Sequence, residues 1–226
     1  MNNKFGVVIA AGGSGTRFGT DIPKQFNEIR GIPIIAHTIS VFQNCDLISE
    51  IVVVTHKDYI VYCNDVAKNF GFTKIRSIIS GGATRQQSVL KGLKELHTQY
   101  VLIHDAARPV ITVDDITNCC NVVETFGACA LGSRITDTVK VSSDGEFIDS
   151  TIDRSKLWAI QTPQCFEREN IIKHHKNAAF ENLTVTDDCM LAEHYGCRIK
   201  LVESKGNNIK ITNYSDLAVA EALLYV

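Results

Sequence analysis

The chain has 226 residues, of which 45% are hydrophobic and 21% are charged. A chain of this length can bury a core without disulfides or metal ions, and its apolar fraction excludes an intrinsically disordered protein. The formal net charge of -2 lacks the basic excess of a protein that binds nucleic acid in bulk, and no apolar stretch is long enough for a transmembrane helix. We therefore expect no nucleic-acid partner and no membrane span.

The 8 cysteines indicate a reduced, cytoplasmic protein. None lies in a Cys-x-x-Cys pair, so their spacing does not predict a zinc site. Most of them fall within apolar segments, where cysteine behaves as a small hydrophobic residue. The N-terminal residues run directly into an apolar strand pattern and do not resemble a signal peptide.

Strand and helix patterns alternate through the first half of the chain. The β-branched run at residues 51–55 is typical of a parallel strand covered on both faces. In chain order we expect a strand at 5–11, a helix at 33–42, a strand at 51–55, a helix at 58–70, a strand at 75–79, a helix at 84–97, a strand at 100–104, a helix at 113–126 and a strand beginning at 128–131. This alternation predicts an α/β fold with a Rossmann-like, doubly wound and mostly parallel sheet.

The alternation breaks after residue 131. Residues 138–141 and 146–149 flank a Ser-Ser-Asp-Gly turn and predict a β-hairpin. A lone hairpin is marginally stable in water, so we expect this protruding arm, about residues 136–156, to pack on another surface such as a second subunit. Beyond it we expect helices at 170–179 and 187–195, a strand at 199–202 and a helix at 215–225, all within one domain over residues 1–226.

A glycine-rich loop follows the first strand, with the sequence AAGGSGTRFG at residues 10–19. Small residues let backbone N–H groups approach a phosphate chain closely. The loop lacks the Gly-Lys-Ser/Thr of a Walker A loop, and its glycines are not spaced as in a dinucleotide fingerprint. Arg17 lies in the loop and Lys24 follows it, so the two cations are candidates to clamp the same phosphates. The alternative is a turn without a ligand, with Lys24 as a solvated surface residue.

Three further segments contain candidate ligand-binding residues, and the first follows a strand at the edge where a doubly wound sheet binds ligands. The Gly-Gly pair at 81–82 precedes a helix N-terminus, which favours anions; the alternative is a tight turn with Thr84 as the N-cap. Asp105 ends a strand and is the kind of carboxylate that holds Mg²⁺ near phosphates, while an ion pair with Arg108 is a compatible alternative. Thr186 is equally a ligand-binding residue or the N-cap of the next helix.

Six motifs in order closely resemble the 2-C-methyl-D-erythritol 4-phosphate cytidylyltransferase family over essentially the whole chain. No single motif is decisive, but the six in sequence are highly specific. They are GSGTR with PKQ (13–17 and 23–25), GG with Arg85 and Ser88 (81–88), DAARP (105–109), TPQ (162–164), TD (186–187) and NIKIT (208–212).

The resemblance implies a nucleotide-diphospho-sugar transferase fold of the glycosyltransferase-A type, and a homodimer in which the arm reaches the partner's active site. It implies the transfer of a cytidylyl group from CTP to 2-C-methyl-D-erythritol 4-phosphate, with release of pyrophosphate, in non-mevalonate isoprenoid precursor biosynthesis. The attacking phosphate is already anionic at neutral pH, so no general base is required. Cations and positioning supply most of the catalysis in such a transfer.

The resemblance also implies residue roles. Arg17 and Lys24 stabilise the transition state, Arg154 and Lys210 position the second substrate, and Asp105 holds Mg²⁺. Arg154 and Thr138 come from the partner's arm. The CTP-binding residues are Ala11, Gly12, Gly13, Ser14, Gly15, Gly82, Arg85 and Ser88, and Arg108, Thr138, Thr162 and Thr186 lie near the second substrate. One departure is Ala83, where family members often have Asp; a contact through the backbone would be unaffected.

Three alternative functions differ from this interpretation. Ribitol 5-phosphate cytidylyltransferase is a close relative, but Ala107 and Arg154 favour methylerythritol phosphate. An oxidoreductase with a dinucleotide site conflicts with the glycine spacing. A nucleotide sensor would bind CTP without releasing pyrophosphate, which fits less well with the joint presence of Arg17, Lys24, Asp105 and Lys210.

Overall fold

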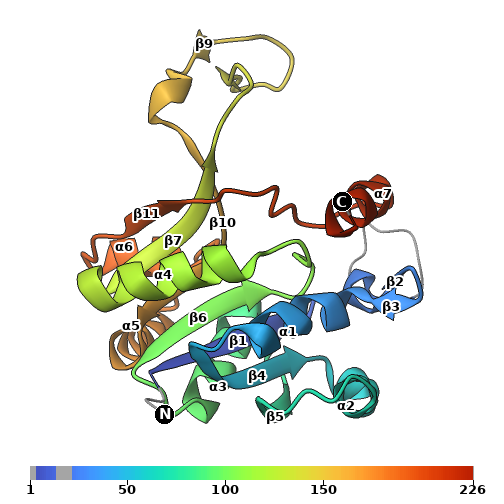
Figure 1. The fold of residues 1–226 in the computed structure, drawn as a ribbon. Coiled ribbons are helices and arrows are strands. Elements are labelled where there is room, and N and C mark those ends of the chain that lie inside the picture. Colours follow the sequence, from blue (N-terminus) through green and yellow to red (C-terminus); the bar gives the residue numbers. More distant parts are fainter. Residues whose placement is uncertain (1–3, 14–21, 226) are drawn as a thin grey trace.

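The computed structural model describes residues 4–13 and 22–225 and is built on a seven-stranded sheet (Figure 1). The strand order is β11-β7-β10-β6-β1-β4-β5. Only β10 is antiparallel to its neighbours, so the predicted mostly parallel sheet is confirmed. The strands are β1 (Phe5–Ala11), β4 (Ile48–Thr55), β5 (Ile75–Ser80), β6 (Tyr100–Asp105), β7 (Ala128–Arg134), β10 (Trp158–Glu167) and β11 (Lys200–Glu203).

Helices cover both faces of the sheet because its strands are apolar on both sides. In β1, Val7 and Ile9 belong to one buried cluster together with residues of α1, α2 and α4, while Val8 belongs to a second cluster with residues of α3, α5 and α6. The predicted helices are all present, with ends that differ by a few residues. They are α1 (Ile34–Asn44), α2 (Ile60–Asn69), α3 (Arg85–Glu95), α4 (Val113–Phe126), α5 (Arg168–Phe180), α6 (Asp188–His194) and α7 (Ser215–Leu224).

The C-terminal helix α7 lies apart from these two layers. It packs with a short hairpin of β2 (Glu28–Ile29) and β3 (Ile32–Pro33) and with the segment that follows β11. This third cluster brings that segment, residues 204–214, back across the sheet toward the end of β1 (Figure 1).

The sequence analysis predicted no strand over residues 158–167, and that omission is wrong. β10 is a long strand inserted between β6 and β7. Its sequence carries a polar run with a proline in the middle, which breaks the apolar pattern on which strand prediction depends. The pairing of β10 with β7 is interrupted at the same place, between Ile160 and Gln164, and the Thr162–Pro163 peptide bond is cis.

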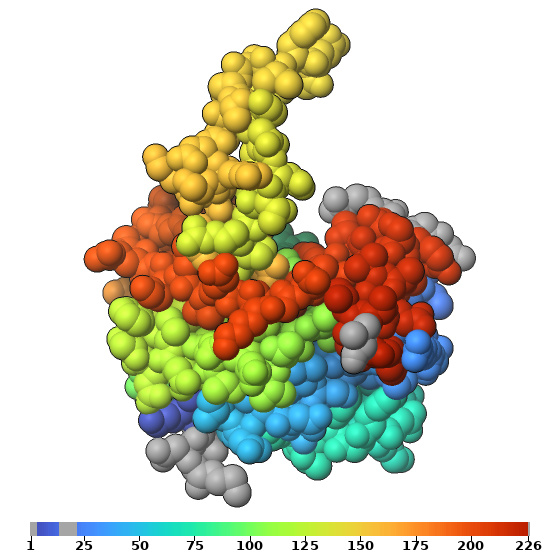
Figure 2. Space-filling model, turned by 45° about the horizontal axis from the view of Figure 1, so that its top comes forward, coloured from blue at the N-terminus to red at the C-terminus, as the bar shows by residue number. Residues whose placement is uncertain are grey.

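The arm leaves the sheet between β7 and β10 and stands out from the body of the molecule (Figure 2). Its strands are β8 (Lys140–Val141) and β9 (Ser150–Thr151), so the predicted second strand at 146–149 is wrong. Those residues belong to a wider loop because the Asp144 carboxylate accepts hydrogen bonds from the backbone N–H groups of Glu146 and Phe147. Such an Asx turn competes with strand pairing.

All eight cysteines are free thiols, and all but Cys197 are buried. Cys119, Cys129 and Cys165 bring their sulfur atoms within 4.8 Å of one another in the core beneath α4. In the described part of the chain, no helix is both apolar enough and long enough to cross a bilayer.

Gly92 allows α3 to approach the sheet closely. A Cβ atom there would lie 2.7 Å from methyl groups of both Val8 and Val54. We predict that Gly92→Ala lowers the free energy of unfolding by about 1–3 kcal/mol through overpacking, although alanine improves helix propensity by about 1 kcal/mol. Urea denaturation measures the change. The exposed Lys94→Ala variant of the same helix is the control, and a Gly92→Ala protein as stable as wild type would contradict this packing.

Candidate active site

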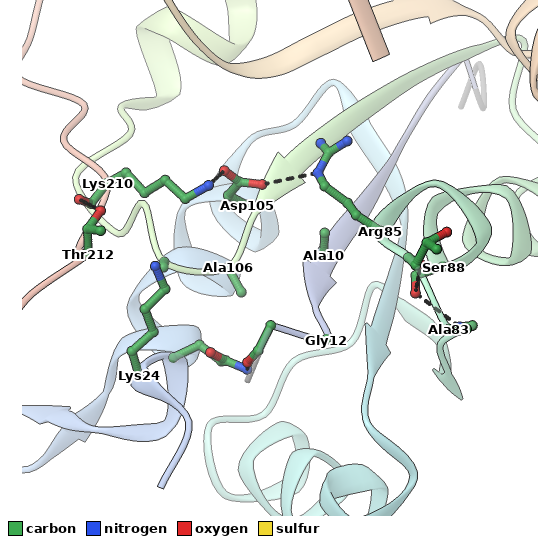
Figure 3. Close-up of a pocket in the computed structure, with 15 residues that line it drawn as sticks. Ala10, Gly12, Lys24, Ala83, Arg85, Ser88, Asp105, Ala106, Lys210 and Thr212 are labelled. Atoms are coloured by element: carbon green, nitrogen blue, oxygen red, sulfur yellow. Dashed lines mark hydrogen bonds and ion pairs between the residues drawn. The ribbon is translucent and has the colours of Figure 1, made fainter. Parts of the chain in front are cut away.

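A pocket of about 550 Å³ opens at the carboxyl ends of β1, β5 and β6 (Figure 3). Ligands bind at this edge in open α/β sheets. The pocket brings together eight of the residues predicted from the sequence: Gly12, Gly13, Lys24, Gly82, Arg85, Ser88, Asp105 and Lys210. The predictions for Ser14, Gly15 and Arg17 fall outside the described residues.

Gln25 joins the glycine loop to the segment that carries Lys24. Its side-chain amide is 3% exposed and donates to the carbonyl oxygens of Ala11 (2.6 Å) and Gly13 (3.1 Å). Lys24 therefore starts a short 3-10 helix, η1 (Lys24–Phe26), at a fixed place on the pocket wall. Ala11 is buried behind this wall and does not line the pocket.

The second wall is the loop between β5 and α3. The Gly82 N–H donates to Ser88 Oγ (3.0 Å), which folds the loop back onto the first turn of the helix. A Cβ on Gly81 would lie 2.6 Å from that Oγ, and one on Gly82 would lie 2.5 Å from Gln87 Cβ. Thr84 caps the helix by accepting from the Gln87 N–H (3.1 Å). The tight turn at the Gly-Gly pair and the N-cap at Thr84 are therefore both present, and the same loop also lines the pocket.

Asp105 is the acidic centre of the pocket. Its carboxylate lies 2.7 Å from Lys210 Nζ, 3.7 Å from Arg108 Nε and 3.9 Å from Arg85 Nε. Lys210 and Arg85 reach it from opposite sides (Figure 3). Burial alone would raise the pKa of Asp105, but the charges of Lys210 and Arg85 lower it to about 2. The group is therefore an anion at neutral pH, and the predicted ion pair with Arg108 is present.

Thr162 supports Asp105 from below the pocket. Its hydroxyl accepts from the Asp105 N–H (3.1 Å) and lies 3.1 Å from His104 Nδ1. Burial lowers the pKa of His104 to about 4, so its imidazole is neutral at pH 7. Nδ1 therefore accepts from Thr162, and Nε2 donates to the Arg108 carbonyl (3.2 Å). Thr162 is only 4% exposed, which makes it a support of the site rather than part of its lining.

The segment that carries Lys210 is tied to the ends of β6 and β10. Arg108 Nη1 donates to the Asn208 carbonyl (2.8 Å), and Asn208 Nδ2 donates to the Thr162 carbonyl (2.7 Å). The Ile211 N–H donates to the Ala107 carbonyl (2.9 Å). These bonds place Lys210 over Asp105 and hold Arg108 behind the pocket wall, where it does not line the pocket.

Helix α6 begins beside the pocket. Its N-cap is Asp187, whose carboxylate accepts from the Met190 N–H (2.8 Å), so Thr186 is not the cap. Thr186 is exposed and does not line the pocket. The sequence analysis did not predict the contact between Asp188 and Arg85, in which the Asp188 carboxylate lies 2.7 Å from Arg85 Nη1.

Thr138 and Arg154 lie on the arm and are exposed. The Arg154 guanidinium donates to the Thr136 carbonyl within the same arm. Neither residue lines the pocket.

The chain matches a family model described as IspD, 2-C-methyl-D-erythritol 4-phosphate cytidylyltransferase, over residues 5–225. It is 42% identical to the protein of that name from Clostridium novyi over 99% of this chain and 97% of the relative. It is 39% identical to the one from Alkaliphilus oremlandii over 98% of this chain and 95% of the relative.

Two solved structures resemble the fold. One is 4-diphosphocytidyl-2C-methyl-D-erythritol synthase from Anaerococcus prevotii, with a TM-score of 0.86 and 29% identity over 100% of this chain and 97% of that chain. The other is 2-C-methyl-D-erythritol 4-phosphate cytidylyltransferase from Thermus thermophilus, with a TM-score of 0.80 and 27% identity over 97% and 98% of the two chains.

The low pKa of Asp105 depends chiefly on Lys210. We predict that Lys210→Met raises the Asp105 pKa above about 2, because the nearest opposing charge is lost while burial remains. In the wild type, the ion pairs of Asp105 stabilise the fold above the ordinary aspartate pKa of about 3.9, and this contribution is lost as the pH falls through about 2. Carboxyl ¹³C NMR follows the titration. Lys156→Met on the arm is the control, and an unmoved Asp105 pKa in Lys210→Met would contradict the assignment.

Proposed function

The chain belongs to the 2-C-methyl-D-erythritol 4-phosphate cytidylyltransferase family, and on that premise we propose which of its residues carry out the transfer. It is a nucleotidyltransferase that joins CTP and 2-C-methyl-D-erythritol 4-phosphate, giving 4-diphosphocytidyl-2-C-methyl-D-erythritol and pyrophosphate. The full-length relatives favour this reaction over the formation of CDP-ribitol. The observation that supports the residue roles most directly is an ionised carboxylate surrounded by cations in the pocket at the carboxyl edge of the sheet.

A phosphate oxygen of the second substrate attacks the α-phosphorus of CTP. A new P–O bond forms, and the bond to the bridging oxygen breaks with release of pyrophosphate. The nucleophile already carries its charge at neutral pH, so the chain has no proton to remove. Its task is to hold two anions in line and to stabilise the charge that spreads over the transferring group.

Lys24 and Arg17 are the cations proposed to face the phosphates of CTP. Lys24 lies on the pocket wall beside Gly12 and Gly13, where a point charge acts on phosphate oxygens without a fixed geometry. The loop at 81–88 forms the opposite wall for the nucleotide. Alanine at position 83, where family members often have Asp, still supports the loop. Its backbone N–H donates to Gln87 Oε1 (2.9 Å).

Asp105 is the residue proposed to hold Mg²⁺. Its charge is retained at neutral pH, and Mg²⁺ commonly takes one or two carboxylates together with substrate phosphate oxygens. The donor set therefore fits the ion. When bound, Mg²⁺ supplies positive charge beside the phosphates, while Lys210 and Thr212 line the side of the pocket proposed for the second substrate.

The arm is proposed to complete the pocket of a second copy in a homodimer. Arg154 and Thr138 are exposed and do not line their own pocket. Phe147 and Ile148 on the same arm are 72% and 66% exposed, which is typical of side chains that a partner covers. The arm arises within the central sheet, so we treat residues 1–226 as one domain. The free thiols support a cytoplasmic location.

Lys24→Ala tests whether Lys24 acts on the phosphates of CTP. We predict a fall in kcat of about 10²–10³, as when a comparable electrostatic contact is removed, with an unchanged melting temperature. Pyrophosphate release from CTP and Mg²⁺ is measured with methylerythritol 4-phosphate and, separately, with ribitol 5-phosphate. The exposed Lys57→Ala variant is the control. A near-normal kcat in Lys24→Ala would exclude the role, and CTP binding without pyrophosphate release in the wild type would indicate a sensor.

A mixing experiment tests the arm. We predict that Lys24→Ala and Arg154→Ala are each nearly inactive, and that mixing them after subunit exchange restores about one quarter of wild-type activity. Restoration follows because one of the two pockets in a mixed dimer would then contain both intact residues. If Arg154 acted within its own subunit, the mixture would stay inactive.

A further inference from the structure

Arg85 lies between two carboxylates that compete for its charge. Its Nη1 is hydrogen-bonded to Asp188 Oδ2 at 2.7 Å, whereas its Nε is 3.9 Å from Asp105 Oδ1. Only the first distance is that of a hydrogen bond. Figure 3 shows the guanidinium facing Asp105, with a dashed line that marks this longer ion pair.

Asp188 is built into the protein interior. It is 1% exposed, and its backbone N–H donates to Gln164 Oε1 (3.0 Å). Burial would raise the pKa of Asp188, but Arg85 and His175 lower it, so the carboxylate stays ionised. A buried, ionised carboxylate needs both partners to offset the cost of removing its charge from water. Asp188 lies outside the pocket and holds Arg85 from there.

His175 is the second partner. It lies on α5, is 1% exposed, and brings Nε2 to 3.1 Å from Asp188 Oδ1. Among the described residues, none offers a hydrogen bond to its buried Nδ1. A proton on Nδ1 would be a buried donor without an acceptor, which is more costly than a buried lone pair. The proton therefore belongs on Nε2, where it is donated to Asp188.

We propose that Asp188, held in place by His175, is a positioning residue that keeps Arg85 at the nucleotide side of the pocket and beyond hydrogen-bonding distance of Asp105. Without Asp188, Arg85 is free to form a close, two-pronged pair with Asp105. Asp105 already has Lys210 at 2.7 Å, and a second close cation would compete with a divalent ion for the same oxygens. The inference rests on the proposed roles of Asp105 and Arg85. It adds that Asp188 determines whether Arg85 pairs closely with Asp105.

Asp188→Asn is the direct test. The paramagnetic ion Mn²⁺ is titrated into protein with CTP, and free Mn²⁺ is followed by electron paramagnetic resonance. We expect Mn²⁺ binding to weaken about ten-fold, within the range of coupling between charged residues in contact, and the KM for CTP to rise. Wild-type Mn²⁺ affinity in a folded Asp188→Asn protein would overturn the proposal.

A double variant separates positioning from a general structural effect. In an Arg85→Ala background, Asp188→Asn should no longer weaken Mn²⁺ binding, because the side chain through which it acts is gone. An equal loss of Mn²⁺ affinity in both backgrounds would overturn the proposal. Mn²⁺ binding also tests this proposal separately from the proposed function. A protein that shows the coupling between Asp188 and Arg85 but releases no pyrophosphate would refute only the proposed function.

The paired histidines of α5 supply a second test that keeps the Asp188 carboxylate. His175→Leu removes the donor and should reproduce part of the Mn²⁺ defect, whereas His175→Gln retains a donor and should restore binding. His174→Gln is the matched control, because His174 stacks on Tyr195, whereas the hydrogen bond to Asp188 comes from His175. Melting temperatures identify any variant that fails to fold. Equal Mn²⁺ binding by folded His175→Leu and wild-type proteins would contradict the role of His175.

Discussion

The buried charge of Asp105 is the constraint around which the pocket is arranged. A carboxylate at the end of a central strand is costly to remove from water unless cations surround it. Those cations come from three places: the start of α3, the loop after β6, and the segment after β11. No two of them are carried by the same element, so the charge of the buried carboxylate is fully balanced only when the whole sheet edge has assembled.

β10 supplies side chains that hold this assembly together. It runs antiparallel between β6 and β7 and carries Thr162 within its interrupted stretch and Gln164 where the pairing resumes. Thr162 fixes the Asp105 backbone from below, and Gln164 accepts the N–H groups of Asp188 and Cys189 at 3.0 Å each. One strand therefore positions both carboxylates that bracket Arg85.

These interactions also explain what the sequence could reveal. Asp105 and the glycines were recognisable because their chemistry lies in short motifs at strand ends, where the fold class alone predicts a ligand. The roles of Lys210 and Arg85 were predicted only from the family resemblance. The parallel strands were recognisable because their apolar runs are continuous. β10 was not, since its polar residues are buried by partners distant in sequence, as with Thr162 and Asp105, which are 57 positions apart. The contact of Asp188 with the site was not recognisable for the same reason, because its partner Arg85 is 103 positions away.

The arrangement of charge also has a consequence for binding. His175, Asp188, Arg85, Asp105 and Lys210 form an alternating series of donors and anions that crosses from the helix layer into the pocket. Asp105 shares the charges of Arg85 and Lys210, so a phosphate that draws either cation toward itself leaves Asp105 with more unbalanced negative charge. A divalent ion bound with the same nucleotide supplies the missing positive charge. Nucleotide and ion are thus expected to bind as a pair, each favouring the other, because a single carboxylate cannot be fully paired with protein cations and also available to a metal.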